Sequence, residues 1–195
     1  MSRLKLTVLG FLGFMVMLSV SRASVVRASD NDLFRWDIVH INFITDVATG
    51  GGHTSAKAND GSSITLTGKG TFIVNSGNPQ DVTGGGTWNT STGGSGNYVV
   101  TGFVSFTVAP GTFPSFLTDH VCDDCIAANA HSGLAVLKVA FDDGSDGVLT
   151  VSCELAGAPP TVFEGITVTK GFVDYWNRDP GDPGNGNGTV FHDLH

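Results

Sequence analysis

The stretch from residue 132 to residue 178 limits the fold most tightly, because it contains three consecutive segments in which apolar and polar side chains alternate. The first two segments, 134–141 and 148–155, enclose the aspartate- and glycine-rich run 142–147. Alternation with a period of two is typical of a strand with one buried face, and such a run between strands is typical of a hairpin loop. The sequence therefore predicts a β-hairpin at the centre of a domain.

The apolar faces of the two segments predict how this hairpin pairs. Leu137 and Phe141 share a face of the first segment, and Leu149 and Cys153 share a face of the second. A loop with an odd number of residues puts both faces on one side of the sheet, whereas a two-residue loop mixes them. We expect three or five loop residues, with a glycine at positive φ. We also expect Phe141 to pair with Leu149, and Leu137 with Cys153.

Further β-rich segments recur along the chain, and no segment after residue 30 shows a helical period with capping residues. The segments span residues 33–43, 62–67, 70–74, 85–89, 98–108, 161–170 and 171–176. Short connections favour antiparallel neighbours. The sequence therefore predicts an all-β protein with a single antiparallel β-barrel over residues 29–178, with a β-sandwich as the alternative.

Both ends of the chain differ in composition from this domain. Residues 1–28 resemble a secretory signal peptide, with Arg3 and Lys5 before an apolar run over 6–20 and small residues after it. That run is short for a membrane span. We therefore predict a secreted protein, located outside the cell, on the cell surface or in the periplasm. Residues 179–195 are rich in glycine, proline and asparagine and are predicted to form a flexible tail.

The charge balance excludes two classes of partner. Four of the 10 basic residues lie in the predicted signal segment, whereas all 18 acidic residues lie after it. A surface this acidic repels phosphate backbones and anionic lipid headgroups. We therefore expect neither nucleic acid nor, after signal cleavage, a membrane as partner. The pattern indicates no particular oligomeric state.

Three cysteines, Cys122, Cys125 and Cys153, predict one disulfide and one free thiol, or an intermolecular bond. All three pairings are open, and the favoured interpretation is a structural crosslink between the barrel and the long irregular loop that contains the first two. His120 and His131 lie near that loop, so a zinc site is an alternative. A single CxxC lacks the second pair of a specific zinc motif, and we predict no metal and no other cofactor.

No catalytic motif is recognisable, which leaves open whether the protein is an enzyme. Paired carboxylates act as acid and base in several hydrolases, and histidines transfer protons near neutral pH. The alternative is that the carboxylates form solvated ion pairs with neighbouring lysines. The weak catalytic candidates are His40, His120, His131, Glu154 and Glu164.

An aromatic-rich barrel suits a small ligand, because small barrels hold either packed side chains or one small molecule. We therefore predict binding of a small apolar ligand as the leading function. The alternatives are an extracellular isomerase, cyclase or hydrolase, and an extracellular interaction module. The candidate ligand-lining residues are Trp88, Phe103, Phe106, Phe141 and Phe163.

Three segments resemble a group of secreted, functionally uncharacterised proteins, mainly from bacteria, with β-barrel-like domains. They are GGHTSAKANDGSSITLTGKGTF, SGLAVLKVAFDDGSDGVLTVSCEL and VFEGITVTKGFVDYWNR. The resemblance covers most of residues 33–178 and implies no activity, so it assigns no site residue. The predicted barrel is also similar in shape to lipocalins, allene oxide cyclases and dirigent proteins, but shared architecture does not imply shared function.

Overall fold

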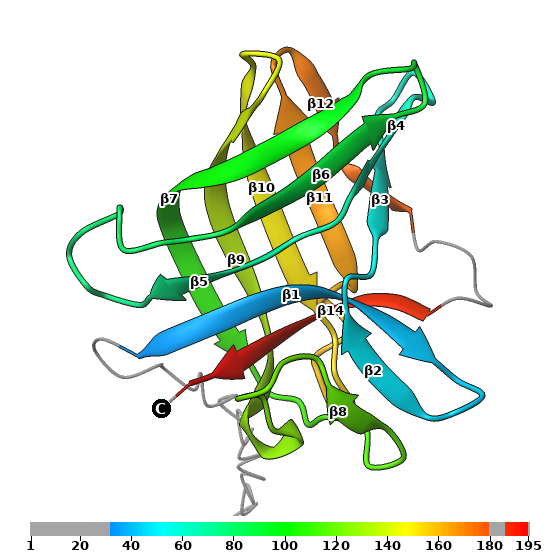
Figure 1. Ribbon diagram of the computed structural model, residues 1–195, viewed down its shortest axis with the longest axis vertical. Coiled ribbons are helices and arrows are strands. Elements are labelled where there is room, and N and C mark those ends of the chain that lie inside the picture. Colours follow the sequence, from blue (N-terminus) through cyan, green and yellow to red (C-terminus); the bar gives the residue numbers. More distant parts are fainter. Residues whose placement is uncertain (1–31, 180–185, 195) are drawn as a thin grey trace, which may run out of the picture.

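The computed structural model describes residues 32–179 and 186–194 and shows an all-β protein (Figure 1). Six antiparallel strands close into a ring in the order β9, β14, β1, β5, β6 and β7. This closure confirms the predicted all-β class and antiparallel barrel. The ring strands are β1 (Leu33–Asn42), β5 (Lys69–Ile73), β6 (Gly85–Thr90), β7 (Ser95–Ala109), β9 (Ala130–Phe141) and β14 (Gly186–Asp193).

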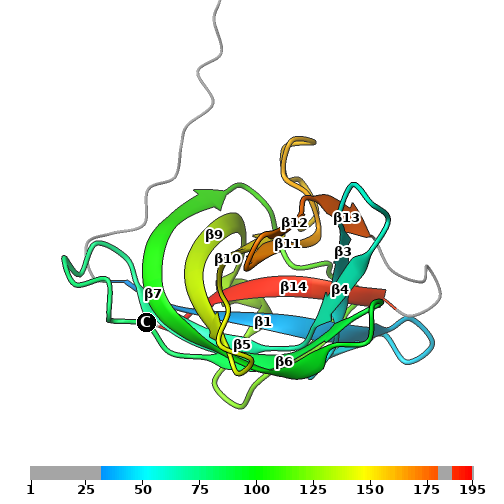
Figure 2. The same ribbon diagram turned by 90° about the horizontal axis from the view of Figure 1, so that it is seen from above.

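The remaining strands extend the sheet on both sides of the ring. From β9 it continues through β10 (Asp146–Cys153), β11 (Gly165–Lys170) and β12 (Val173–Tyr175). From β6 it continues through β4 (Ser63–Leu66), β3 (Thr54–Lys57) and β13 (Asn177–Asp179). The two extensions curl toward each other (Figure 2), and β11 lies against β3.

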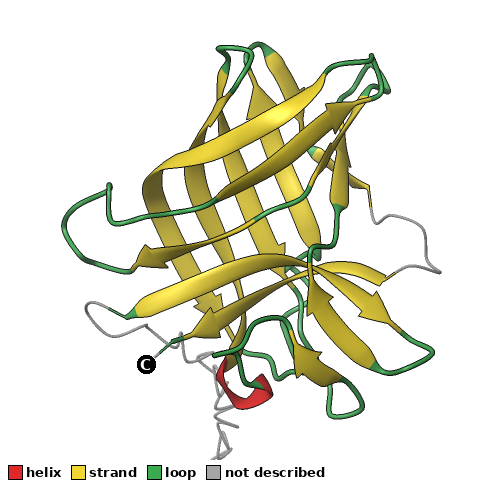
Figure 3. Cartoon of the chain, in the orientation of Figure 1, coloured by secondary structure: helices red, strands yellow, loops and turns green. Residues whose placement is uncertain are grey.

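The outer face of β1 is covered by the irregular loop of residues 110–129, called the covering loop, which pairs with a short strand at the edge of β1. β2 (Val47–Gly50) pairs with β1 and also with β8 (Thr118–His120). The only helical turn in the described residues is the 3₁₀ turn η1 (Ala127–Asn129), beside β8 (Figure 3). Within this part of the chain, no helix has the length and apolar character needed to cross a membrane. The covering loop therefore buries one side of β1 outside the barrel.

The structure corrects the prediction for the C-terminus. Residues 186–193, predicted to belong to a flexible tail, form β14 between β1 and β9, and Val190, Phe191 and His192 are buried. The segment is short and begins with alternating glycines, so its local pattern is that of a loop. Pairing on both edges supplies the stability that its own composition lacks. Residues 1–28 and 180–185 lie outside the described residues, so the signal peptide stays a prediction.

The central hairpin has the predicted type of loop but a different register. Phe141 N–H donates to the carbonyl oxygen of Ser145 at 2.8 Å, which closes a three-residue turn in which Gly144 has a φ of 87°. The predicted pairs are wrong, because Leu137 pairs with Leu149 and not with Cys153. This displacement of four residues along β10 is even, so the apolar faces stay together. Phe141 opposite Leu149 implies a loop of seven residues, which conflicts with the predicted loop of three or five, and the observed register shortens it to three.

Aromatic side chains fill the interior of the six-stranded ring. The ring centroids of Phe72 and Phe103 are 5.0 Å apart, and those of Phe106 and Phe191 are 4.7 Å apart. Phe34 packs against Phe72 and Phe106 in the same cluster. A barrel of so few strands has an interior just wide enough for side chains. These contacts explain why the strands are rich in phenylalanine.

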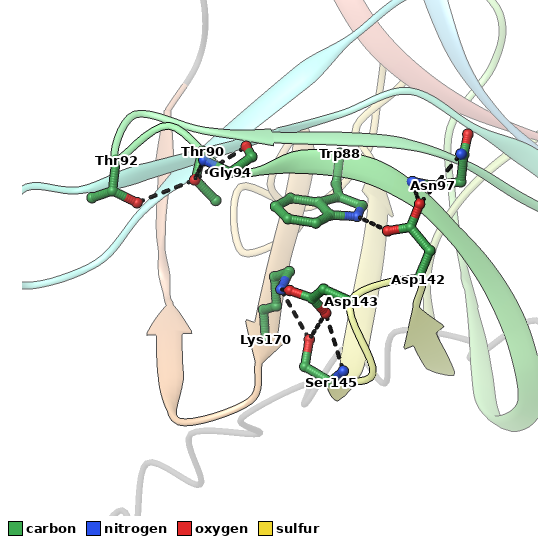
Figure 4. Close-up of polar contacts among 9 residues, drawn as sticks. All are labelled: Trp88, Thr90, Thr92, Gly94, Asn97, Asp142, Asp143, Ser145 and Lys170. Carbon is green, nitrogen blue, oxygen red and sulfur yellow. Dashed lines mark hydrogen bonds and ion pairs between the residues drawn. The ribbon is translucent and has the colours of Figure 1, made fainter.

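A polar network joins the β9–β10 turn to neighbouring strands (Figure 4). It lies at the end of the barrel opposite to the covering loop (Figure 1). Asp142 accepts hydrogen bonds from Trp88 Nε1 at 3.1 Å and from the backbone N–H of Asn97 at 2.7 Å. Lys170 Nζ lies 4.1 Å from the centroid of the Trp88 ring and forms an ion pair with Asp143. The hydrogen bond from Lys170 lowers the pKa of Asp143 to about 2. This network gives Trp88 and Lys170 a structural role.

Candidate functional site

An apolar pocket with a volume of about 230 Å³ lies between β1, β14 and the covering loop. Val39 and Ile41 on β1 contribute to its wall, on the strand face opposite to the buried Ile38. The remaining wall residues are Phe43, Ala48, Phe113, Pro114, Leu117, Glu154, Leu155, Glu164, Gly188, Thr189 and Val190. The wall therefore combines a hydrocarbon surface with two carboxyl groups and one hydroxyl group.

Glu164, in the loop that precedes β11, is held by three polar groups. Its Oε2 accepts a hydrogen bond from the backbone N–H of Glu154 at 2.6 Å, and its Oε1 accepts one from the backbone N–H of Thr189. Thr189 Oγ1 lies 3.0 Å from Glu164 Oε1 and 2.5 Å from the carbonyl oxygen of Ser152. A hydroxyl carries one proton, so both contacts of Thr189 Oγ1 are satisfied together only when Glu164 is protonated.

The environment of Glu164 raises the pKa of its carboxyl group. Burial raises the pKa of this carboxyl to about 7, against the opposing effect of its hydrogen bonds from Glu154 and Thr189. The group therefore exists in both protonation states near neutral pH. A carboxyl with such a pKa in an apolar pocket is typical of binding and catalytic sites.

The structure brings the two predicted carboxylates together but leaves the predicted histidines elsewhere. Glu154 and Glu164 line the same pocket, whereas this wall contains no histidine. His40 lies half-buried on β1, and His120 is exposed on β8. His131 on β9 packs its ring edge-on against Phe34, and burial lowers its pKa. A catalytic role for these histidines stays a prediction.

The predicted ligand-lining aromatics lie mostly in the packed parts of the protein. Phe103 and Phe106 belong to the aromatic cluster inside the ring. Trp88 and Phe141 pack edge-to-face at the end of the barrel that carries the polar network. Phe163 lines a separate, shallow surface depression. Contact of these rings with a ligand stays a prediction, and the pocket described above uses other side chains.

Cys122 and Cys125 form a disulfide, and Cys153 is a free thiol that is fully buried on β10. The favoured interpretation of a crosslink between the loop and the barrel is therefore wrong. Cys153 continues the apolar face of Leu149 and Val151 and lies in the core, whereas the loop covers the outer face of β1. Burial raises the pKa of the Cys153 thiol.

The free thiol leads to a simple stability prediction. Cys153→Ala is expected to lower the free energy of unfolding by about 1–2 kcal/mol, because it removes a buried sulfur from a packed core. The loss measured by thermal unfolding should be the same with and without dithiothreitol. A loss that disappears under reducing conditions would show that Cys153 forms a disulfide after all.

One buried group contains potential metal ligands. Ligand atoms of Asp37, Cys125 and His192 lie within 4.8 Å of one another, and all three residues are buried. The Cys125 sulfur is bonded to Cys122, so it is not available as a thiolate. In this oxidised state the group lacks a thiolate donor, and we assign no metal to it.

Thr189 and His192 are not among the site residues predicted from the sequence, because both lie in the predicted tail. His192 Nε2 lies 2.9 Å from Asp119 Oδ2, and both side chains are buried. The available signal was Val190-Phe191, the one pair of adjacent apolar residues in the predicted tail. The glycine-rich residues that precede it favour a loop, so no strand is predicted there.

No family model, curated protein or solved structure matches the chain. The resemblance to secreted bacterial proteins therefore stays a prediction.

Proposed function

We propose that the protein binds a small, largely apolar molecule in the pocket beside Glu164. The observation that supports this proposal is an apolar cavity whose wall includes a carboxyl with a pKa of about 7. Ligand sites usually combine a hydrocarbon lining with a few polar groups that orient the ligand. The cavity lies on the side of the barrel, between the ring and its covering loop, and is small enough to require a compact ligand.

The hydrogen bonding of Glu164 suggests the polar group of this ligand. Each carboxylate oxygen has two acceptor positions. Thr189 engages Oε1 through its N–H and its hydroxyl, and the N–H of Glu154 occupies one position of Oε2. One acceptor position on Oε2 remains for a hydroxyl or amino group. We therefore expect an apolar molecule that carries a single such donor.

The exposed side chain of Phe43 supports a site that a ligand covers. Phe43 belongs to the pocket wall, yet 53% of its surface is exposed to water. Covering apolar surface is favourable by about 25 cal/mol per Å². A ligand that contacts this ring would therefore gain affinity from its burial.

The test compares p-cresol with toluene, which share a ring and a methyl group but differ by one hydroxyl. Ligand-observed NMR is expected to show binding of both, with p-cresol favoured. Phe43→Ala should weaken both by about tenfold, because part of the apolar contact is lost. Phe172→Ala, which truncates an exposed phenylalanine at the β11–β12 turn, is the matched control and should leave both unchanged.

Glu164→Gln then tests the polar contact. The preference for p-cresol over toluene is expected to decrease several-fold, while the affinity for toluene stays close to that of the wild type. Absence of binding of either probe, or equal loss in Phe43→Ala and Phe172→Ala, would contradict the proposal.

Proton-transfer catalysis in the same pocket is a second candidate, favoured by the pKa of Glu164. It predicts turnover of a compact chromogenic ester or glycoside that Glu164→Gln abolishes, while toluene still binds. Turnover that persists in Glu164→Gln would exclude this carboxyl as the acid or base.

A further inference from the structure

The covering loop buries a cluster of ionisable groups against the Cys122–Cys125 disulfide. A carboxylate oxygen of Asp37, a ring nitrogen of His192 and the Cys125 sulfur lie within 4.8 Å of one another. Asp37 on β1 is 1% exposed, and His192 on β14 is fully buried. The cluster is separate from the Glu164 pocket in its residues and does not depend on the function proposed there.

His192 has one nitrogen engaged and one free. Its Nε2 lies 2.9 Å from Asp119 Oδ2, whereas its buried Nδ1 has no hydrogen-bond partner among the described residues. Burial alone would raise the pKa of Asp119, but hydrogen bonds from His192 and from the Val121 N–H hold it below its ordinary value. An ionised Asp119 accepts the Nε2 proton, so the neutral imidazole presents Nδ1 as a base.

Acidic side chains lie on two sides of this imidazole. Arg35 holds Asp37 with two hydrogen bonds, of 2.6 and 2.7 Å, and Asp119 lies on the other side of His192. His192 is therefore placed both to accept a proton from a nearby thiol and to return it.

The two sulfurs differ in their access to water. Cys122 is half-buried, whereas Cys125 is 6% exposed and adjoins the cluster. Only two residues separate them, and a disulfide that closes so short a loop restricts the unfolded chain little. A purely structural crosslink also has no need of an unpartnered imidazole at the buried sulfur.

We propose that the Cys122–Cys125 disulfide is a thiol–disulfide exchange site that oxidises dithiols, with His192 as the proton carrier for Cys125. The asymmetry of the two sulfurs sets the direction of attack, since an incoming thiolate reaches Cys122 first. The sulfur that leaves, Cys125, is the one beside the imidazole. This arrangement matches the need of exchange chemistry for a stabilised leaving thiol.

The reaction balances as a two-electron transfer. One thiolate of the dithiol attacks Cys122 Sγ, the Cys122–Cys125 bond breaks, and its electron pair passes to Cys125 Sγ, which takes a proton from the His192 imidazolium. The second thiolate of the dithiol attacks the mixed disulfide and releases Cys122 as a thiolate. The dithiol leaves as a disulfide. One of its two protons restores the imidazolium that gave its proton to Cys125, and the other protonates the Cys122 thiolate. Reoxidation by a disulfide reverses these steps, with His192 Nδ1 accepting the Cys125 proton.

The experiment uses the full chain with Cys153→Ala, so that Cys122 and Cys125 are the only cysteines whose alkylation is measured. Dithiothreitol is added without denaturant, and the reaction is quenched with iodoacetamide and followed by mass spectrometry. Reduction is expected at least tenfold faster than in the oxidised peptide HVCDDCI. His192→Gln should slow it at least tenfold, and His40→Gln, on the same strand as Asp37, is the matched control and should leave the rate unchanged.

Because His192 is buried, a second pair of variants tests the proposal with the imidazole in place. In the Cys153→Ala chain, Cys125→Ser leaves the Cys122 thiol, which should form a mixed disulfide with oxidised glutathione. Cys122→Ser leaves the Cys125 thiol, which should react at least tenfold more slowly. Reduction that requires denaturant, a rate equal to that of the peptide, or faster capture at Cys125 would overturn the proposal.

Discussion

A chain that ends at Asp179 is expected to lose cooperative folding. Such a chain lacks β14, which closes the ring by pairing with β1 on one edge and with β9 on the other. Its removal opens both edges and takes Phe191 away from Phe72 and Phe106. Loss of one buried phenylalanine already destabilises a core by about 3–5 kcal/mol, and whole domains are stable by only about 5–15 kcal/mol. Open strand edges also favour aggregation.

Thermal unfolding followed by circular dichroism provides the measurement. The truncated chain should show no sigmoidal transition, and Phe191→Ala in the full chain should keep the transition but lose about 3–5 kcal/mol. The control is a chain that ends at Asp193, which retains all of β14 and should unfold close to the full-length midpoint. A cooperative transition in the chain that ends at Asp179 would show that the barrel does not need β14.

The free energy of unfolding is expected to decrease as the pH rises from about 4.5 to about 7. Burial raises the pKa of Glu164 from its ordinary 4.5 to about 7 in the folded protein. Between these values the folded state holds a proton that the unfolded state releases, so the stabilisation is full below 4.5 and is lost as the pH passes 7. A shift of this size corresponds to roughly 3 kcal/mol.

Chemical denaturation of the wild type and of Glu164→Gln at pH 5 and pH 7.5 isolates this contribution. The lowered pKa values of Asp119 and Asp143 act below about pH 4, outside this window. Burial lowers the pKa of His131. The titration of His131 changes the stability within this window, but by the same amount in both proteins. The pH-dependent loss should be smaller in Glu164→Gln by roughly 3 kcal/mol. An equal loss in both proteins would show that Glu164 titrates at an ordinary pKa.

The hairpin around Gly144 shows how far local pattern predicts this fold. Its strand period, odd loop and positive φ follow from the choice of side chains within about 20 residues. Its register does not, because Leu137 gains the same burial opposite Leu149 as opposite Cys153. The shorter turn decides between them, and both registers keep the same apolar faces inward.

The candidate site depends more strongly on long-range pairing. Glu154 and Glu164 are a candidate pair in the sequence, but the residue that binds Glu164 Oε1 is Thr189, 25 residues further along. The pocket forms only where β14 and the covering loop meet β1. The Cys122–Cys125 bond likewise depends on the covering loop lying against the outer face of β1, away from Cys153 in the core.

The sequence by itself determined that this chain forms antiparallel strands and buries their aromatic faces, since alternation and turn residues act over neighbouring positions. Only the tertiary structure decided that residues 186–193 form a strand, that the barrel closes with six strands, that Thr189 binds Glu164, and that His192 is buried. The physical reason is that the hydrogen bonds and desolvation that hold these groups come from residues distant in the chain. Their energies exist only once the ring has closed.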